Sequence, residues 1–122
     1  MLHFELSEFD SPDEIGSGKL MDDAFLQMLD YARGIAGIPF RITSGFRTPS
    51  HNAYVGGVQP SLKSKGSSHL FGYAADIACS STYDREIILN SLIRAGFRRI
   101  GIANGFIHVD NDPDKNAAVW LY

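Results

Sequence analysis

The chain lacks several features that would place it in other classes of protein. A single cysteine, Cys79, rules out an internal disulfide and is best explained as a small buried residue. No apolar run is long enough to cross a membrane, and residues 1–6 do not have the basic start and apolar stretch of a signal peptide. The net charge of −3 lacks the basic excess that nucleic-acid binding selects for. We therefore expect a protein made in the cytoplasm, with no membrane span and no nucleic-acid partner.

The length and composition are those of an ordinary folded domain. With 122 residues, 44% hydrophobic and 20% charged, the chain can bury one hydrophobic core but not two. We expect a single domain over residues 1–122. The sequence carries no signal for assembly, so a monomer is the working expectation.

Hydrophobic periodicity predicts an α+β fold. Apolar residues at helical spacing predict a helix over residues 20–35 and a second helix from about Thr82 to Gly96. Short apolar or alternating segments predict strands at residues 40–43, 73–78, 97–102, 105–109 and 117–121.

The segments between these elements are rich in turn-forming residues. Residues 1–19 contain clusters of Ser, Gly, Pro and Asp, which indicate an extended arm with turns rather than a helix. Residues 48–55 predict a short helix capped by Thr48, with Pro49 at its first position. Residues 58–68 predict a mobile loop, well placed to border or cover a cleft.

A histidine and an aspartate with six residues between them form the most informative stretch, Ser67–Asp76. Imidazole nitrogen and carboxylate oxygen are good zinc ligands, and a catalytic zinc usually has three protein ligands and one open position. On one straight strand His69 and Asp76 would point to opposite faces, so the backbone must turn between them, which Gly72 permits. His108 offers a third ligand. Two alternatives remain open. In a helix, positions seven apart would also lie on one face. A capped turn followed by a core strand would explain the same residues without a metal ion.

Three patches, in order along the chain, resemble one family of zinc peptidases. The patches are Ile42–Pro49 with the following His51, Asn52 and Val55–Gly57; Ser67–Asp76, with the pattern Ser-x-His then Gly-x-Ala-x-Asp; and Gly101–Ile102 with Phe106–Asp110. The resemblance extends over nearly all of the chain, from Glu8–Pro12 to Trp120. The family is that of the zinc D-alanyl-D-alanine carboxypeptidases, the M15 peptidases, which trim bacterial cell-wall peptides, together with their phage lysis relatives.

The resemblance implies a fold and a set of site residues. The implied fold is α+β, with a small antiparallel-rich sheet, two main helices on one face and a zinc cleft on the other, as in the hedgehog/DD-peptidase group. The implied zinc ligands are His69, Asp76 and His108. Arg47 corresponds to the arginine that the family uses on its substrate, to stabilise the oxyanion or to grip a carboxylate, and Ser67 adds a polar contact to substrate.

The implied function is a zinc metallopeptidase that hydrolyses peptide bonds in peptidoglycan stem peptides. It would act on the cell wall as a D,D-carboxypeptidase or an L,D-endopeptidase, in phage lysis, in a virion or after export by other means. An alternative is a catalytically silent zinc domain that binds wall peptide or a protein partner. That alternative is favoured by a missing acid, because many relatives have a glutamate three residues before the last histidine ligand and others a histidine two before. This chain has Gly105 and Phe106 there.

Asp110 is the remaining acid near the last histidine. Two residues along a strand from His108, its side chain returns to the same face roughly 6–7 Å further on, which permits action as the general base, directly or through a water. It can equally orient His108 as a hydrogen-bond partner, or cap the following turn. His51 is a weaker candidate for the base. We expect His3 to lie at the surface or a sheet edge. We expect Trp120 to pack in the core, and the alternative is a position in the wall of the cleft.

Overall fold

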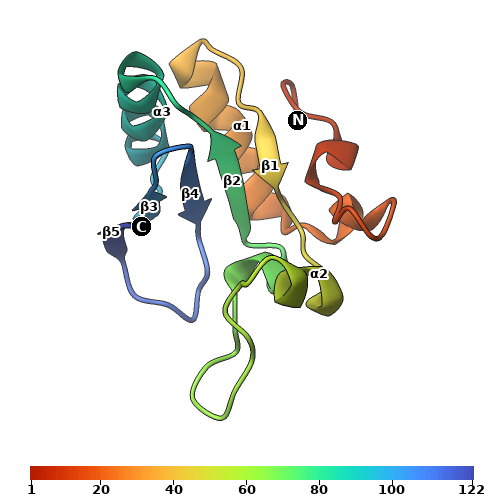
Figure 1. Cartoon of the computed structure of the whole chain (residues 1–122). Coiled ribbons are helices and arrows are strands. Elements are labelled where there is room, and N and C mark those ends of the chain that lie inside the picture. Colours follow the sequence, from red (N-terminus) through yellow and green to blue (C-terminus); the bar gives the residue numbers. More distant parts are fainter.

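The computed structural model describes all 122 residues, which fold around a five-stranded sheet (Figure 1). In spatial order the strands are β1 (Ile42–Ser44), β2 (Ala74–Ala78), β4 (Phe106–Asp110), β3 (Arg99–Ile102) and β5 (Ala118–Leu121). Neighbouring strands are antiparallel except β3 and β5, which run parallel. The α+β fold with an antiparallel-rich sheet is therefore confirmed.

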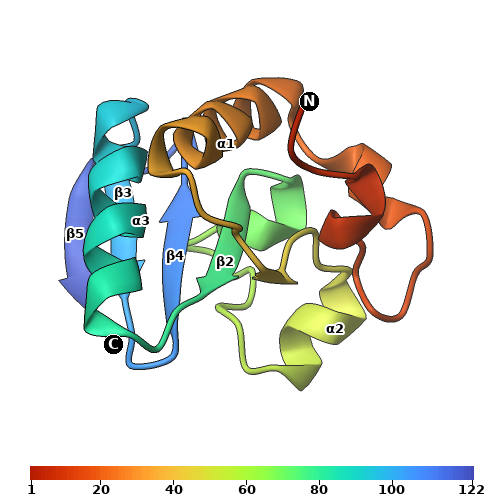
Figure 2. The same ribbon diagram turned by 90° about the horizontal axis from the view of Figure 1, so that it is seen from above.

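Two helices, α1 (Asp23–Ala36) and α3 (Thr82–Arg94), lie together on one face of the sheet (Figure 2). Each begins where a side chain accepts from a free backbone N–H of the first turn. The Asp22 carboxylate accepts from the Phe25 N–H at 2.9 Å, and the Ser81 hydroxyl plays the same part for α3. The cap explains why α1 begins at Asp23, although apolar spacing predicts residue 20.

Four short helices complete the chain: η1 (Leu6–Phe9), η2 (Ser17–Leu20), α2 (Pro49–Tyr54) and η3 (Ser68–Phe71). The first two correct the expectation of an extended arm without helix over residues 1–19. Phe4 and Phe9 are buried and pack edge to face, with ring centroids 5.3 Å apart. Burial of these two rings holds the arm against the core, and polar composition alone does not reveal it.

The two faces of the sheet differ in chemistry because side chains alternate along each strand. One continuous cluster of 17 buried residues forms the core against α1 and α3, and Cys79 belongs to it as expected. The strands contribute Ile77, Ile100, Ile107 and Val109 to this cluster. None of the helices combines the length and the apolar character that a membrane span requires.

Candidate metal centre

A turn that ends in Gly72 brings His69 and Asp76 to one place. Helix η3 carries His69, whose backbone N–H donates to the Ser67 hydroxyl at 3.3 Å. Gly72 follows with φ of +78°, and a Cβ there would lie 2.5 Å from the carbonyl oxygen of Leu20. Because only glycine fits this conformation and this space, the turn depends on Gly72. Strand β2 then begins and carries Asp76.

Strand pairing brings His108 to the same place. Asp76 and His108 are directly opposite each other in the antiparallel pair of β2 and β4. All three side chains are buried, and one potential ligand atom from each lies within 4.8 Å of the other two. The Asp76 Oδ1 atom is 3.4 Å from His69 Nε2 and 3.0 Å from His108 Nδ1. These three atoms therefore surround one point.

Hydrogen bonds on the far side of each imidazole determine which nitrogen faces that point. His69 Nδ1–H donates to the carbonyl oxygen of Gly45 at 2.8 Å, which leaves Nε2 free to bind a metal. His108 Nε2–H donates to Asp110 Oδ2 at 2.7 Å, which leaves Nδ1 to face the point between the three side chains. Such partners fix the tautomer and the orientation of metal-binding histidines. Two imidazole nitrogens and one carboxylate oxygen fit zinc with an open position.

Burial and these hydrogen bonds also determine the charges. Burial by itself would raise the pKa of Asp76, but hydrogen bonds with His108 and His69 outweigh it and hold the pKa well below its usual range. Burial lowers the pKa of His69, so its ring is neutral at pH 7, which is the form that binds metal. Burial also opposes charge on His108, yet its bonds to Asp110 and Asp76 raise its pKa. Metal binding requires the neutral form of His108, so a metal ion and a second ring proton would compete for Nδ1.

Arg47 reaches the centre from the end of β1. Its Nη2 donates to Asp76 Oδ2 at 3.3 Å, its Nε donates to Ser44 Oγ at 2.9 Å, and its Nη1 donates to Asn52 Oδ1 at 3.2 Å. Asn52 is fully buried and donates in turn to the carbonyl oxygen of Val58 at 3.0 Å. The guanidinium is therefore held in a fixed orientation. Asn52 lies in the first patch of the family resemblance, but the sequence pattern does not indicate this role for it.

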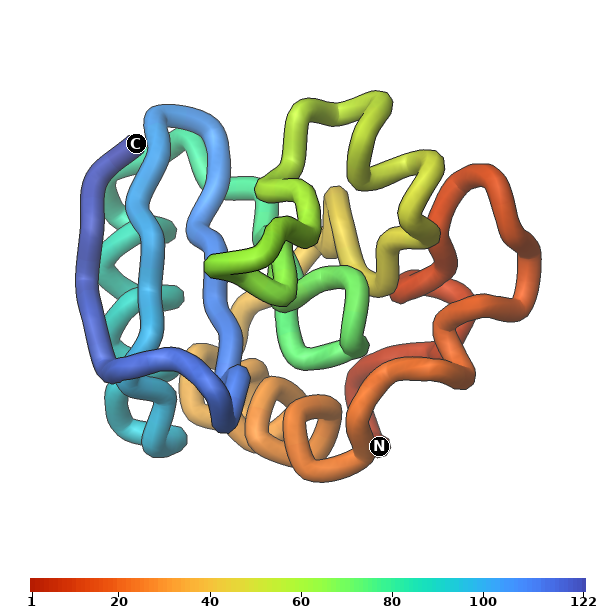
Figure 3. Tube along the Cα trace, turned by 90° about the horizontal axis from the view of Figure 1, so that it is seen from below, coloured from red at the N-terminus to blue at the C-terminus, as the bar shows by residue number.

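A cavity of about 440 Å³ opens on the centre. Its lining includes every site residue selected from sequence: Arg47, Ser67, His69, Asp76, His108 and Asp110. The loop over residues 58–67 projects from the body, lies between β4 and α2 when seen from below (Figure 3), and contributes Val58 to the lining. The loop therefore borders the cavity, as the sequence predicts.

The other two histidines lie outside the cavity. His51 stacks against Tyr54 on α2, with ring centroids 6.3 Å apart. The backbone N–H of His3 donates to Asp30 on α1 at 2.8 Å, and the His3 side chain is exposed. The geometry therefore disfavours His51 as a base and agrees with the surface position expected for His3.

A family model described as peptidase M15 matches residues 3–110. The chain belongs to the peptidase M15 family. The resemblance identified from its motifs is thereby confirmed, and it supports a metallopeptidase with the buried His69, Asp76 and His108 as its potential metal site. The match ends before β5, so Lys115 and Trp120 lie outside the matched residues. No curated protein matches the chain.

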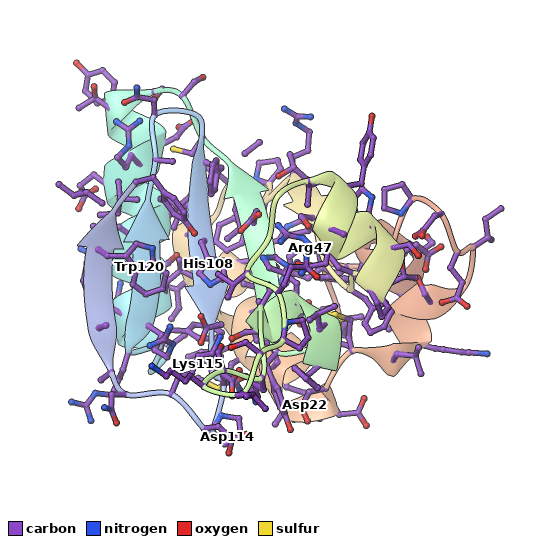
Figure 4. All side chains as sticks on the ribbon, turned by 60° about the horizontal axis from the view of Figure 1, so that its bottom comes forward. Asp22, Arg47, His108, Asp114, Lys115 and Trp120 are labelled. Atoms are coloured by element: carbon purple, nitrogen blue, oxygen red, sulfur yellow. The ribbon has the colours of Figure 1, made fainter.

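Trp120, beyond the M15 match, lines the cavity instead of packing in the core. Its ring lies beside His108, with centroids 5.4 Å apart (Figure 4). Gly101 is directly opposite both residues in β3, and a Cβ there would lie 2.6 Å from the indole. The absence of a side chain at Gly101 therefore allows the indole to lie over the sheet. The core position expected for Trp120 is wrong because β5 is an edge strand and this side chain faces away from α3.

Asp110, the acid nearest to His108 in the sequence, contacts that ring on the side away from Asp76. Its Oδ2 accepts from His108 at 2.7 Å, and its Oδ1 accepts from Arg99 Nε at 2.7 Å and from the Asp112 N–H at 3.2 Å. Burial raises the pKa of Asp110, but the bond to His108 and the other donors outweigh it and lower the pKa. Both oxygens are already hydrogen-bonded, so the geometry favours orientation of His108 over proton abstraction.

Proposed function

We propose that the protein is a zinc metallopeptidase that hydrolyses peptide bonds in peptidoglycan stem peptides. The main support is the buried centre of His69, Asp76 and His108, which opens on a cavity of about 440 Å³ in a chain of the M15 family. That volume is in the range of small-molecule and peptide-residue sites. The donor set is typical of a catalytic zinc with one open position.

Each side chain around the centre has a distinct task in this proposal. His69 Nε2, His108 Nδ1 and Asp76 Oδ1 would hold zinc, whose Lewis acidity polarises a carbonyl and makes water nucleophilic at neutral pH. Arg47 lines the cavity beside Asp76 and donates to the substrate, either to the carbonyl oxygen as negative charge develops or to a carboxylate. Ser67 caps the turn that carries His69 and offers its hydroxyl at the cavity wall.

Asp110 acts as a positioning residue in this proposal. Its Oδ2 accepts the Nε2 proton of His108, which keeps Nδ1 directed at Asp76 and the centre. Arg99 holds the other oxygen of Asp110, so the carboxylate cannot rotate freely. The alternative, in which Asp110 takes the proton of the attacking water, would have to use the acceptor position that Oδ2 keeps beyond its bond to His108.

A catalytically silent zinc domain that binds wall peptide or a protein partner is a second candidate. One observation favours it: both carboxylates in the cavity lining are already hydrogen-bonded within the protein. Asp76 contacts both histidines and Arg47, and Asp110 contacts His108 and Arg99. No glutamate lines the cavity.

Incubation with purified peptidoglycan separates the two candidates. We expect the protein to bind one zinc ion and to release new amino termini, to lose this activity with a chelator, and to regain it when zinc is added. His69→Ala should lower turnover by more than ~100-fold. Loss of a residue that only hydrogen-bonds a metal ligand already lowers metal affinity or activity by ~10–100-fold, and His69 would bind the metal directly. His51→Ala, a histidine outside the cavity, should keep both zinc and activity. Stoichiometric zinc without any release would establish the silent domain, and full activity without metal would refute the zinc centre.

A further inference from the structure

The cavity carries positive charge in a protein that is acidic overall. The net charge of the chain is −3, yet the cavity lining contains the cations Arg47, Arg99 and Lys115 and only two carboxylates, Asp76 and Asp110. Both carboxylates are hydrogen-bonded to His108. A concave surface with excess charge of one sign concentrates ligands of the opposite sign.

Lys115 is held at the cavity by two acceptors. Its Nζ donates to the carbonyl oxygen of Gly66 at 3.0 Å and to the Ser68 hydroxyl at 2.9 Å. The Asp112 carboxylate lies 3.9 Å away, accepts from Ser68 at 2.7 Å and pairs with Lys65 at 2.6 Å. An ammonium group has three N–H donors, so Lys115 keeps one for a ligand.

Arg99 provides further donors at the same end of the cavity. Its Nε donates to Asp110 and its Nη1 to the carbonyl oxygen of Asn116, whereas its Nη2 makes no hydrogen bond within the protein. The guanidinium lies over the Trp120 ring, with Cζ 5.1 Å from the centroid, and only 17% of the side chain is exposed. Arg99 is therefore a fixed donor and not a mobile surface charge.

We infer that Arg99 and Lys115 form a subsite for a carboxylate of the substrate peptide. Figure 4 shows Arg47 and Lys115 on different sides of His108, so this subsite is separate from the position that Arg47 serves. The inference rests on the proposed peptidase function and narrows its substrate to an acidic peptide, with a carboxylate at a residue other than the one that Arg47 contacts. Arg99 lies within the residues matched by the family model, and Lys115 lies beyond them.

Three synthetic stem peptides test the subsite. The first has a γ-linked D-glutamate with a free α-carboxylate, the second has that carboxylate as an amide, and the third has an amidated C-terminus. Since hydrogen bonds to charged groups contribute more than neutral ones, we expect the wild-type kcat/KM to fall by about 10- to 100-fold for the second peptide. An equal fall confined to the third peptide would identify the terminal carboxylate as the group recognised, and would support the subsite only if Lys115→Gln removes the fall, because Arg47 can also bind a carboxylate.

Substitutions of lysine then assign the effect. Lys115→Gln keeps an N–H donor but loses the charge, so the ratio of kcat/KM for the acid and amide peptides should fall toward one. Lys115→Arg should restore the ratio. Lys63→Gln, an exposed lysine at the tip of the 58–67 loop, should leave it unchanged. Melting temperatures establish that each variant is folded.

The outcomes distinguish the subsite from the function on which it rests. Wild-type protein that cleaves none of the three peptides and releases nothing from peptidoglycan would refute the proposed function. Wild-type protein that cleaves all three equally well would retain the function and overturn the carboxylate subsite. A ratio unchanged in folded Lys115→Gln would also overturn it.

Discussion

Neighbouring residues of the same strands build the two faces of the sheet with opposite chemistry. On β4, Ile107 and Val109 are fully buried in the apolar core, whereas His108 and Asp110 face the cavity. The apolar face stabilises the fold through the area that it removes from water. The cavity face buries polar groups, which persist because each has a hydrogen-bond partner. Substitutions one residue apart should therefore have separable effects on stability and on metal binding.

The largest effect is expected on the apolar face. Ile107→Ala removes a fully buried side chain and should lower the free energy of unfolding by ~2–5 kcal/mol, through lost transfer energy and the cavity left behind. Urea denaturation measures this loss. Ile93→Ala is the matched control, because Ile93 is 55% exposed on α3 and should change stability by less than about 0.5 kcal/mol. Folded Ile107→Ala should still bind one zinc ion. Loss of zinc from the folded variant would show that the two faces are not separable.

A smaller effect is expected from a substitution of Asp110. Its pattern decides whether Asp110 orients His108 or acts as the general base. Asp110→Asn keeps the shape but weakens the acceptor for His108, so zinc affinity should fall by ~10–100-fold. Excess zinc should then restore most of the turnover. The measurement is zinc content and turnover on the same preparation, across a titration of the metal.

The opposite pattern would assign Asp110 as the general base. Turnover lower by ~10²–10⁴-fold with full zinc occupancy is the signature of a lost proton acceptor. Unchanged turnover with full zinc would remove Asp110 from both roles. Asn111→Ala is a useful control, because Asn111 follows Asp110 directly but does not line the cavity.

Sequence alone predicts those features that depend on local pattern. The strands follow from short apolar or alternating segments, α3 follows from its apolar residues at helical spacing, and the set of potential metal ligands follows from the resemblance combined with a glycine between His69 and Asp76. The role of Asp110 does not follow from spacing, because a base and an orienting partner both need the same face as His108. Only the hydrogen bonds to His108 and Arg99 distinguish the two roles.

Features that depend on contacts between distant segments of the chain cannot be predicted from local sequence patterns. The position of Trp120 depends on β5 pairing with β3 at the edge of the sheet and on the empty space at Gly101. Periodicity shows that Trp120 alternates with its neighbours, but not which element covers it. The pairing of Lys65 with Asp112, residues 47 apart in sequence, likewise depends on where two loops meet.

The smallest effect on stability is expected at the ion pair of Lys65 and Asp112, which connects the 58–67 loop to the turn after β4. Burial opposes both charges, but hydrogen bonds to Asp112 and Asp114 raise the pKa of Lys65, and hydrogen bonds from Lys65 and Ser68 lower the pKa of Asp112. The stability that ionised Asp112 contributes is present above its ordinary pKa of 3.8 and is lost as the pH falls through the lowered pKa. The stability that charged Lys65 contributes is complete below its ordinary pKa of 10.5 and is lost as the pH rises through the raised pKa.

Lys65→Met should therefore cost stability in a pH-dependent way. At pH 7 we expect a loss of about 1 kcal/mol, because the pair is only partly shielded from water and Lys115 still lies 3.9 Å from Asp112. The difference from wild type should shrink as the pH falls below about 4, because protonated Asp112 no longer needs the cation. Urea denaturation at pH 7 and pH 3 measures both values, with Lys63→Met as an exposed control on the same loop. A difference that is equal at the two pH values would mean that Lys65 stabilises the loop through its packing over Phe71 and Tyr73, and not through its charge pair with Asp112.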